Sequence, residues 1–398
     1  MRKAFGKTAI CLLLGLCLLA GGPVSVFAEG SAASPAGGAS GAPDQSMAKE
    51  EVSRMENPGD EICVTGKVTE IQKHGHVELD ITIEDFVLSG FDLGDIIAVK
   101  AGTFEGDLPY LSGYYTDRGE GLVRAYPGKD CIALCINYGS FAEMASLSVG
   151  DPVSLSLKEK AGALALQEAS NLVYSLDGAD YASDEIFANF RPVIVGKLYR
   201  SASPVDNRYN RAPTADRLMQ EAGIRSVMNM ADTAEEMAEL LSVEENSSPY
   251  FRELYASGNV ITLGMPTDYT SDGFGEHIVR GFTFLSEHEP PYLVHCLEGK
   301  DRTGFAAMLL EMLSGFSSES VIEDYMRSYV NAFHIDPGSE KYDVIVDKNI
   351  EDMMLMIAGL QEGGSLEGID WKPLAEGYLL SHGMSEAALS ALEAKIAP

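Results

Sequence analysis

The chain has 398 residues, of which 45% are hydrophobic and 22% are charged. This composition is typical of a folded globular protein with room for two domains, so disorder throughout the chain is excluded. The formal net charge is −31, because 60 acidic residues outnumber 29 basic ones. A surface of mostly one sign repels nucleic acids and anionic lipids, so we expect no nucleic-acid partner.

Residues 1–28 have the pattern of a secretory signal peptide. Three cations, Arg2, Lys3 and Lys7, precede an apolar run over residues 8–20, and a small residue, Ala28, closes the pattern. The apolar run is too short to cross a bilayer as a helix. We therefore predict a secreted or extracytoplasmic protein with no stable membrane span after cleavage.

A linker and a β-rich region follow. Residues 29–59 are rich in Gly, Ala, Ser and Pro and predict a flexible linker. Over residues 60–180, turn residues separate short β-type runs, which are ICVTGKV, HVELDITI, DIIAVKA, CIALCINYG and PVSLSLK. This pattern predicts a small all-β barrel or sandwich. Because the region has no dense set of catalytic residue types, we expect an accessory domain.

Four cysteines lie beyond the predicted signal peptide: Cys63, Cys131, Cys135 and Cys296. Cys131 and Cys135 share one predicted strand, where four residues of rise separate them by about 13 Å. This exceeds the roughly 7 Å between Cα atoms that a disulfide tolerates. Any native disulfide should therefore join Cys63 to Cys131 or Cys135, and Cys296 should be free.

From residue 185 onward, strands alternate with helices, which predicts an α/β fold with a mostly parallel sheet flanked by helices. The predicted strands are KLYRSA, RSVMNM, NVITLGM and PYLVHC. The predicted helices are TADRLMQEAG, FGEHIVRGFTFLSEH, TGFAAMLLEMLSG, SESVIEDYMRSYVNAF, DVIVDKNIEDMMLMIAGL, WKPLAEGYLLSHG and, after a Ser385 N-cap, EAALSALEAKI.

One segment carries chemistry: HCLEGKDRTG, residues 295–304, lies between an apolar strand and an apolar helix. A loop in this position turns its amides toward the helix N-terminus and creates an anion site. Gly299 and Gly304 permit a positive φ or a close backbone approach. The same field favours a thiolate at Cys296, and Arg302 supplies a fork for two phosphate oxygens.

This segment resembles the Cys-x5-Arg signature loop of cysteine-dependent protein tyrosine phosphatases, especially the bacterial enzymes with a Gly-Lys-Asp-Arg-Thr-Gly loop. The resemblance extends to KLYRSASP, AGIRSVMNMADTAEE and DYMRSYVNAF, and thus covers residues 185–335. We assign residues 185–398 to a phosphatase domain. The resemblance implies a phosphocysteine intermediate on Cys296, a Thr303 hydroxyl that stabilises the leaving thiolate, and no metal or other cofactor. It also implies a phosphate cradle whose members are Arg302, Leu297, Glu298, Gly299, Lys300 and Gly304.

The general acid has two candidates. Tyrosine phosphatases commonly carry a Trp-Pro-Asp loop upstream of the cysteine, but the single tryptophan here, Trp371, follows the motif. The upstream segment MPTDYTSDGF offers Asp268 and, less favourably, Asp272. Asp301 precedes the signature arginine, as in myotubularin-like phosphatases, and the loop itself holds it in place. We favour Asp301 over Asp268, and we expect His295 to orient the loop rather than act as a base.

Basic residues are concentrated in one stretch. Residues 191–225 contain seven Lys and Arg residues and three acidic ones, for a net charge of 7 − 3 = +4. The basic residues are Arg191, Lys197, Arg200, Arg208, Arg211, Arg217 and Arg225. We expect a positive rim that attracts an anionic substrate, with Arg200 in contact with it.

The sequence therefore predicts a phosphomonoester hydrolase, with a phosphotyrosine protein as the favoured substrate. A phosphoinositide or inositol-phosphate phosphatase is the enzymatic alternative, favoured by Lys300 and the basic stretch. A non-catalytic module that binds a phosphorylated ligand is the remaining alternative.

Overall fold

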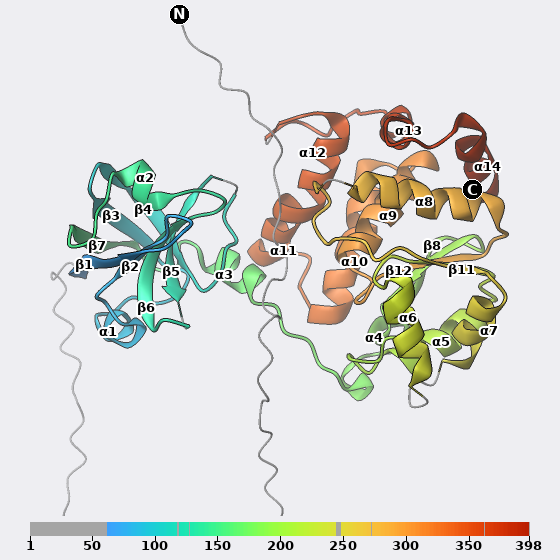
Figure 1. Ribbon diagram of the computed structural model, residues 1–398, viewed down its shortest axis with the longest axis horizontal. Helices are drawn as coiled ribbons and strands as arrows, with labels where there is room; N and C mark the ends of the chain where they lie inside the picture. The colour runs from blue at the N-terminus through green and yellow to red at the C-terminus, as the bar shows by residue number, and fades with distance from the viewer. Residues whose placement is uncertain are drawn as a thin grey trace, which may run out of the picture.

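The structure is a computed structural model that describes residues 62–117, 119–126, 128–243, 248–271, 273–361 and 363–397 (Figure 1). The predicted signal peptide and linker lie outside the described residues. A β-barrel and an α/β domain are joined by a segment that contains α3 (Leu164–Ser170). No helix in the described ranges is long and apolar enough to cross a membrane.

The first domain is a closed barrel with strand order β1–β2–β6–β5–β4–β3–β7. Its interior contains the fully buried rings of Phe86, Phe91 and Tyr110, and the first two stack with centroids 4.1 Å apart. Closure leaves no unpaired sheet edge. The elements are β1 (Cys63–Ile71), β2 (Val77–Leu79), α1 (Ile83–Leu88), β3 (Ile96–Ala101), β4 (Phe104–Leu111), β5 (Gly121–Tyr126), β6 (Cys131–Ile136), α2 (Phe141–Ala145) and β7 (Pro152–Glu159).

Two local predictions in the barrel were wrong or incomplete. HVELDITI was predicted as one strand, but β2 ends at Leu79 because Thr82 caps α1, accepting a hydrogen bond from the Asp85 amide at 3.0 Å. Strand β4 was not among the predicted runs, and it contains Pro109, a residue that is uncommon within strands. All four cysteines in the described chain are free, so Cys63 forms no disulfide with Cys131 or Cys135.

The second domain has a five-stranded sheet of order β11–β10–β12–β9–β8. The four strands β11, β10, β12 and β9 are parallel, and β8 pairs with β9 in the antiparallel sense. The strands are β8 (Arg191–Ile194), β9 (Leu198–Ser201), β10 (Ser226–Asn229), β11 (Val260–Thr262) and β12 (Tyr292–His295). The chain thus has a mixed α/β fold preceded by a seven-stranded barrel.

Successive residues of β12 enter two different hydrophobic clusters. Tyr292 and Val294 pack with side chains of α8 (Phe274–Glu287), α9 (Asp301–Leu313) and α10 (Ser318–Phe333), whereas Leu293 packs with α5 (Ala212–Glu221) and α7 (Pro249–Ala256). This alternation is the period of two expected of a strand that is buried on both faces. The other elements are η1 (Gly178–Asp180), α4 (Asp184–Phe187), α6 (Ala234–Ser242), α11 (Glu340–Ile345), α12 (Asp352–Ala358), α13 (Trp371–Ser381) and α14 (Glu386–Ile396).

The segment DVIVDKNIEDMMLMIAGL was predicted as a helix, and the backbone is helical from residue 340 to residue 358, but not as one regular α-helix. A π-helical turn, Val346–Glu351, separates α11 from α12. Within it, Lys348 forms an ion pair with Asp117 of the barrel domain, and Asn349 donates a hydrogen bond to Tyr329. These two tertiary contacts, which no helical periodicity encodes, accompany the wider turn.

Candidate active site

The sheet register places Cys296 where three loops converge. His295, the last residue of β12, is level with Asn229 of β10 and with Ser201 of β9. Because the three strands are parallel, the residues that follow them meet at one edge of the sheet. Cys296 is the first residue past that edge, and it is only 4% exposed.

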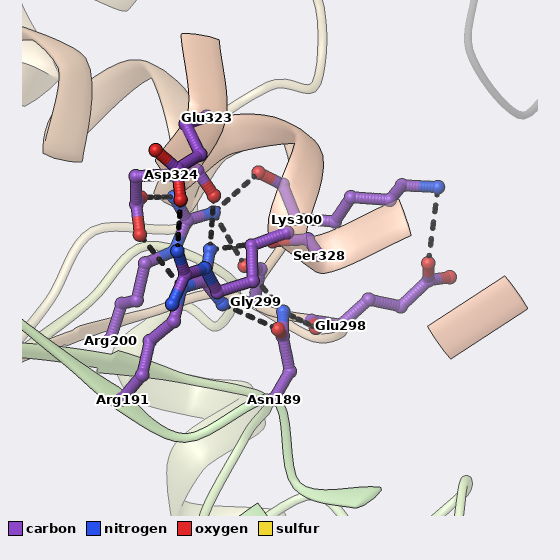
Figure 2. A network of polar contacts seen from close by, with 10 residues as sticks. Asn189, Arg191, Arg200, Glu298, Gly299, Lys300, Glu323, Asp324 and Ser328 are labelled. Atoms are coloured by element: carbon purple, nitrogen blue, oxygen red, sulfur yellow. Dashed lines mark hydrogen bonds and ion pairs between the residues drawn. The ribbon is translucent and has the colours of Figure 1, made fainter. Parts of the chain in front are cut away.

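The loop after Cys296 is held from its outer side through four successive carbonyls. The bonds are Ser203 N to Leu297 O (3.0 Å), Asn189 Nδ2 to Glu298 O (3.3 Å) and Gly299 O (3.0 Å), and Arg200 Nη2 to Gly299 O (2.8 Å) and Lys300 O (3.1 Å). Figure 2 shows Asn189 and Arg200 reaching this loop. In a trans peptide the N–H points opposite to the C=O. The following amides are therefore turned to the inner side.

Those amides have no partner in the described part of the protein: the backbone N–H groups of residues 297–303 donate to no described group. Lys300, the N-cap of α9, also makes no side-chain capping bond. Converging free amides in front of a helix dipole form an anion site. Gly299 is required for this shape, because it has φ 71° and a Cβ there would lie 2.2 Å from the Ser201 carbonyl oxygen.

Gly304 was predicted to contact substrate, and the structure corrects this. Its amide donates to the Lys300 carbonyl at 2.7 Å as part of α9, so it is not available to an anion. A Cβ at this position would lie 2.4 Å from the Tyr325 ring. Gly304 therefore permits α9 to pack closely against α10.

Arg200 was also predicted to contact substrate, but its side chain is fully buried. Besides holding the loop carbonyls, it forms an ion pair with Asp324 at 2.6 Å, and Arg191 pairs with the other oxygen of the same carboxylate at 2.7 Å (Figure 2). Burial alone would raise the pKa of Asp324, but Arg200 and Arg191 outweigh it and lower the pKa to about 2. Arg200 is thus a structural support of the loop.

Three other basic residues of that stretch, Arg208, Arg217 and Arg211, are also engaged by the protein itself. Arg208 pairs with Asp206 at 2.6 Å, and Arg217 pairs with Asp184 and Glu221. Arg211 is buried, with its guanidinium 4.6 Å from the centre of the Tyr174 ring. Most of the local excess of positive charge is therefore consumed by acidic partners or by packing.

Arg302 connects the loop to two other segments of the edge. Its Nη1 donates to the carbonyls of Met230 (3.2 Å) and Met265 (3.0 Å), which follow β10 and β11. Its Nε and Nη2 donate to no group that the structure describes. This second edge of the guanidinium has the planar fork geometry that matches two phosphate oxygens.

Two further polar side chains of this segment, His295 and Thr303, are buried. His295 is fully buried, and its Nδ1 lies 3.1 Å from the Cys296 carbonyl oxygen. Burial lowers the pKa of His295 to about 4, so the ring is neutral at pH 7 and is suited to orienting the loop rather than to proton transfer. The Thr303 hydroxyl is buried and has no hydrogen-bond partner among the described residues.

Asp301 lies close to the Lys300 side chain and to Tyr329. Its Oδ1 accepts a hydrogen bond from the Tyr329 hydroxyl at 3.3 Å, its Oδ2 is 3.8 Å from Lys300 Nζ, and the side chain remains 30% exposed. Burial raises the pKa of Asp301 above its usual range; Lys300 opposes the increase, and Glu298 adds to it. A raised pKa in a carboxyl that still reaches solvent suits a proton donor.

Lys300 is engaged by the protein itself. Its Nζ is 3.4 Å from Glu298 and lies about 5 Å from the ring centres of Tyr329 and Phe333. Burial alone would lower the pKa of Lys300, but Asp301 and Glu298 hold it above its usual value. The ammonium charge is therefore largely balanced inside the site. Leu297 and Glu298 of the same loop are half-buried.

The alternative acid, Asp268, lies in the loop after β11. Its Oδ1 accepts hydrogen bonds from the amide (2.9 Å) and hydroxyl (2.8 Å) of Thr270, which is the arrangement of an Asx turn. The Arg302 bond to Met265 attaches the start of this loop to the signature loop. Asp272 lies outside the described residues.

Sequence reasoning missed three residues that shape this site: Asn189, Asp324 and Tyr329. The segment DYMRSYVNAF contains two of them, and the position of Asp324 among buried α10 residues was the available signal. No local pattern singled out Asn189, whose role depends on β8 and the loop lying side by side.

A sequence comparison supplies the deciding observation. The profile described as "Tyrosine phosphatase family" matches residues 187–397, just over half of the chain. The chain belongs to the tyrosine phosphatase family. A relative in Cupriavidus necator, named "Putative tyrosine-protein phosphatase", is 28% identical over 158 residues. That alignment covers 35% of this chain and 56% of the relative, so the chain spans little more than half the length of the curated relative it matches.

Two solved structures are similar to parts of this chain. The core catalytic domain of the PP-IP phosphatase SIW14 from S. cerevisiae is 18% identical with a TM-score of 0.25, over 43% of this chain and 91% of that chain. An uncharacterised conserved protein from Thermotoga maritima is 22% identical with a TM-score of 0.23, over 24% of this chain and 37% of that chain.

Proposed function

We propose that this family member is a cysteine-dependent phosphomonoesterase. The Cys296 thiolate attacks phosphorus as the bond from phosphorus to the ester oxygen breaks, and Asp301 protonates the departing oxygen. Water then attacks the phosphocysteine, the P–S bond breaks, and inorganic phosphate and the thiolate are released. The Thr303 hydroxyl is buried and has no hydrogen-bond partner among the described residues. We assign to it the stabilisation of that thiolate, because it directly follows the signature arginine.

One observation carries this proposal: the carbonyls of residues 297–300 are bound from outside, while the amides of residues 297–303 have no partner in the described chain. A ring of preorganised donors stabilises the equatorial oxygens of the transferring phosphoryl group without reorganisation. The free edge of Arg302 adds two charge-assisted donors. Together these features support phosphoryl chemistry at Cys296 rather than simple burial of a thiol.

Asp301 is the acid we favour. The loop places it one residue from Arg302, and burial raises its pKa, so protonation at neutral pH is easier. Asp268 instead uses one carboxyl oxygen to hold its own turn. Proton donation from Asp268 therefore requires either the other oxygen or a rearranged loop.

Phosphotyrosine is the favoured substrate because the site presents little uncompensated positive charge beyond the cradle. Lys300 faces two carboxylates, and Arg191 and Arg200 are buried against Asp324. A polyphosphorylated inositol would need further cations to bind its remaining phosphates. The charge pattern therefore supports a substrate with a single phosphoryl group, and inositol phosphates remain the alternative.

A substrate panel tests the reaction and its substrate. Wild type should hydrolyse an aryl phosphate and a phosphotyrosine peptide faster than a phosphoinositide, and Cys296→Ser should abolish turnover while vanadate still binds. Vanadate binding without wild-type turnover would indicate a binding module. Turnover by Cys296→Ser near the wild-type rate would remove Cys296 as nucleophile.

A comparison of leaving groups tests the acid, because a phenolate of low basicity leaves without protonation. Asp301→Asn should lose much more rate on phosphotyrosine than on an activated aryl phosphate, and it should flatten the basic limb of the kcat/KM profile. Asp268→Asn is the matched control and should do less of both. The opposite ranking would assign the acid to Asp268.

The N-terminal pattern of residues 1–28 supports export as part of this proposal. An exported enzyme must keep Cys296 reduced outside the cytosol. Reversible loss of activity in peroxide, with recovery in thiol, is therefore the expected behaviour of the exported enzyme.

A further inference from the structure

A loop of the barrel domain enters the catalytic domain. Tyr115, in the segment after β4, is 7% exposed and belongs to the same hydrophobic cluster as Cys296 and Tyr329. Two residues later, both oxygens of Asp117 lie 2.7 Å from Lys348 Nζ. Among the described residues, the barrel therefore contacts the catalytic domain through the buried Tyr115 ring and through the ion pair between Asp117 and Lys348.

The second of these contacts reaches the π-helical turn that faces the active site. Asn349, adjacent to Lys348, is fully buried and donates through Nδ2 to the Tyr329 hydroxyl at 2.9 Å. That hydroxyl in turn donates to Asp301 Oδ1 at 3.3 Å. Three consecutive contacts thus connect the barrel with the general acid of the proposed reaction.

Several charged or titratable groups surround Asp301. On its own segment these are Lys300, Glu298 and Arg302; α10 adds Tyr325 and Tyr329, and the barrel adds Tyr115. The Tyr329 hydrogen bond stabilises the ionised carboxylate and so lowers the pKa of Asp301, against the increase caused by burial. Burial raises the pKa of Tyr115 to about 12, while Lys300 and a side-chain interaction with Asn349 oppose the increase.

We infer that the barrel domain positions the general acid, with the Asp117–Lys348 pair holding Asn349 so that Tyr329 is aimed at Asp301. This inference rests on the proposed function, and in particular on Asp301 as the proton donor. Tyr329 is a positioning residue, since it acts through Asp301. The barrel is then part of the catalytic apparatus rather than a separate accessory module.

Tyr329→Phe tests the last contact of the chain. Loss of the hydroxyl removes a bond to the ionised carboxylate, so Asp301 stays protonated to higher pH. The basic limb of the kcat/KM profile should move upward by about half to one pH unit. A merely structural role for Tyr329 would lower the rate at every pH and leave the limb in place, and that result would overturn the inference.

The barrel contact is tested with a charge-neutral double variant, Asp117→Asn with Lys348→Met, in the full chain. The side chains of Asp117 and Lys348 are 22% and 19% exposed, so the fold should tolerate these two substitutions. The basic limb should move in the same direction by a smaller amount, and by nothing further when Tyr329→Phe is already present. The matched control is Glu168→Gln with Lys341→Met, which removes an ion pair of 3.3 Å between α3 and α11.

Five outcomes are decisive. A limb that moves in the Asp117/Lys348 variant but not in the Glu168/Lys341 control supports the inference. If the basic limb does not move in the Asp117/Lys348 variant, the role of the barrel is overturned, but the role of Tyr329 is not. The same holds if the Asp117/Lys348 variant moves the limb equally with and without Tyr329→Phe. Equal shifts in the control pair would show a general effect of domain contact, which also overturns it. If Asp301→Asn lacks the leaving-group signature, the acid assignment and this inference fail together.

Discussion

Asp324 forms ion pairs with two buried guanidinium groups, and its removal should cost the α/β domain much of its stability. The Asp324 side chain is 13% exposed, and those of Arg191 and Arg200 are 8% and 0% exposed. A pKa of about 2, compared with an ordinary value of about 3.9, corresponds to roughly 2 to 3 kcal/mol of stabilisation of the carboxylate. Asp324→Asn also removes the carboxylate that pairs with both arginines and leaves the buried Glu311 as the other acid that interacts with them, so we expect a total loss of about 3 to 5 kcal/mol.

The pH dependence of this loss has a defined sign. Because folding lowers the pKa of Asp324, its contribution is present above the unfolded value of about 3.9 and disappears as the pH falls toward about 2. The difference in unfolding free energy between wild type and Asp324→Asn should therefore not narrow between pH 7 and pH 5. It should narrow only at lower pH.

Denaturant unfolding followed by tryptophan fluorescence measures the α/β domain selectively. Trp371 is the only tryptophan of the chain, and it lies buried at the start of α13. Glu323→Gln is the matched control, because Glu323 forms an exposed ion pair with Arg327 and should change stability by less than about 1 kcal/mol. A loss at Asp324 no larger than at Glu323, or a difference that already narrows between pH 7 and pH 5, would refute the reasoning.

Two further predictions concern the loop. Gly299→Ala should reduce turnover by more than tenfold, because its Cβ would meet the Ser201 carbonyl oxygen at 2.2 Å, whereas Gly377→Ala in α13 has open space and should leave kcat/KM unchanged; equal activity in the two variants would contradict the cradle geometry. In alkylation followed by mass spectrometry, Cys296 should be the fastest-reacting thiol at neutral pH, and vanadate should protect it but not the exposed Cys63. Protection of neither or of both would count against an anion site at Cys296.

Local signals in the sequence were sufficient for the elements that carry the site. The apolar run PYLVHC and the helix after it correspond to β12 and α9, and the Ser385 hydroxyl caps α14 as predicted, accepting a bond from the Ala388 amide. Such features depend on residues a few positions apart, so sequence spacing contains them. The spacing of cysteine, glycine and arginine in residues 295–304 likewise indicated an anion loop before any tertiary contact was known.

Tertiary structure decided where the charges point. Counting basic residues predicted a positive rim, but Arg200 is fully buried against Asp324, a partner 124 positions later in the chain. The barrel contact at Lys348 and the π-helical turn were equally invisible to local patterns. The physical reason is that the period of a helix or strand specifies only which face of the element is buried. The partner of a buried charge depends instead on which distant segments pack against that face. A charge buried there without a partner would cost too much free energy to persist.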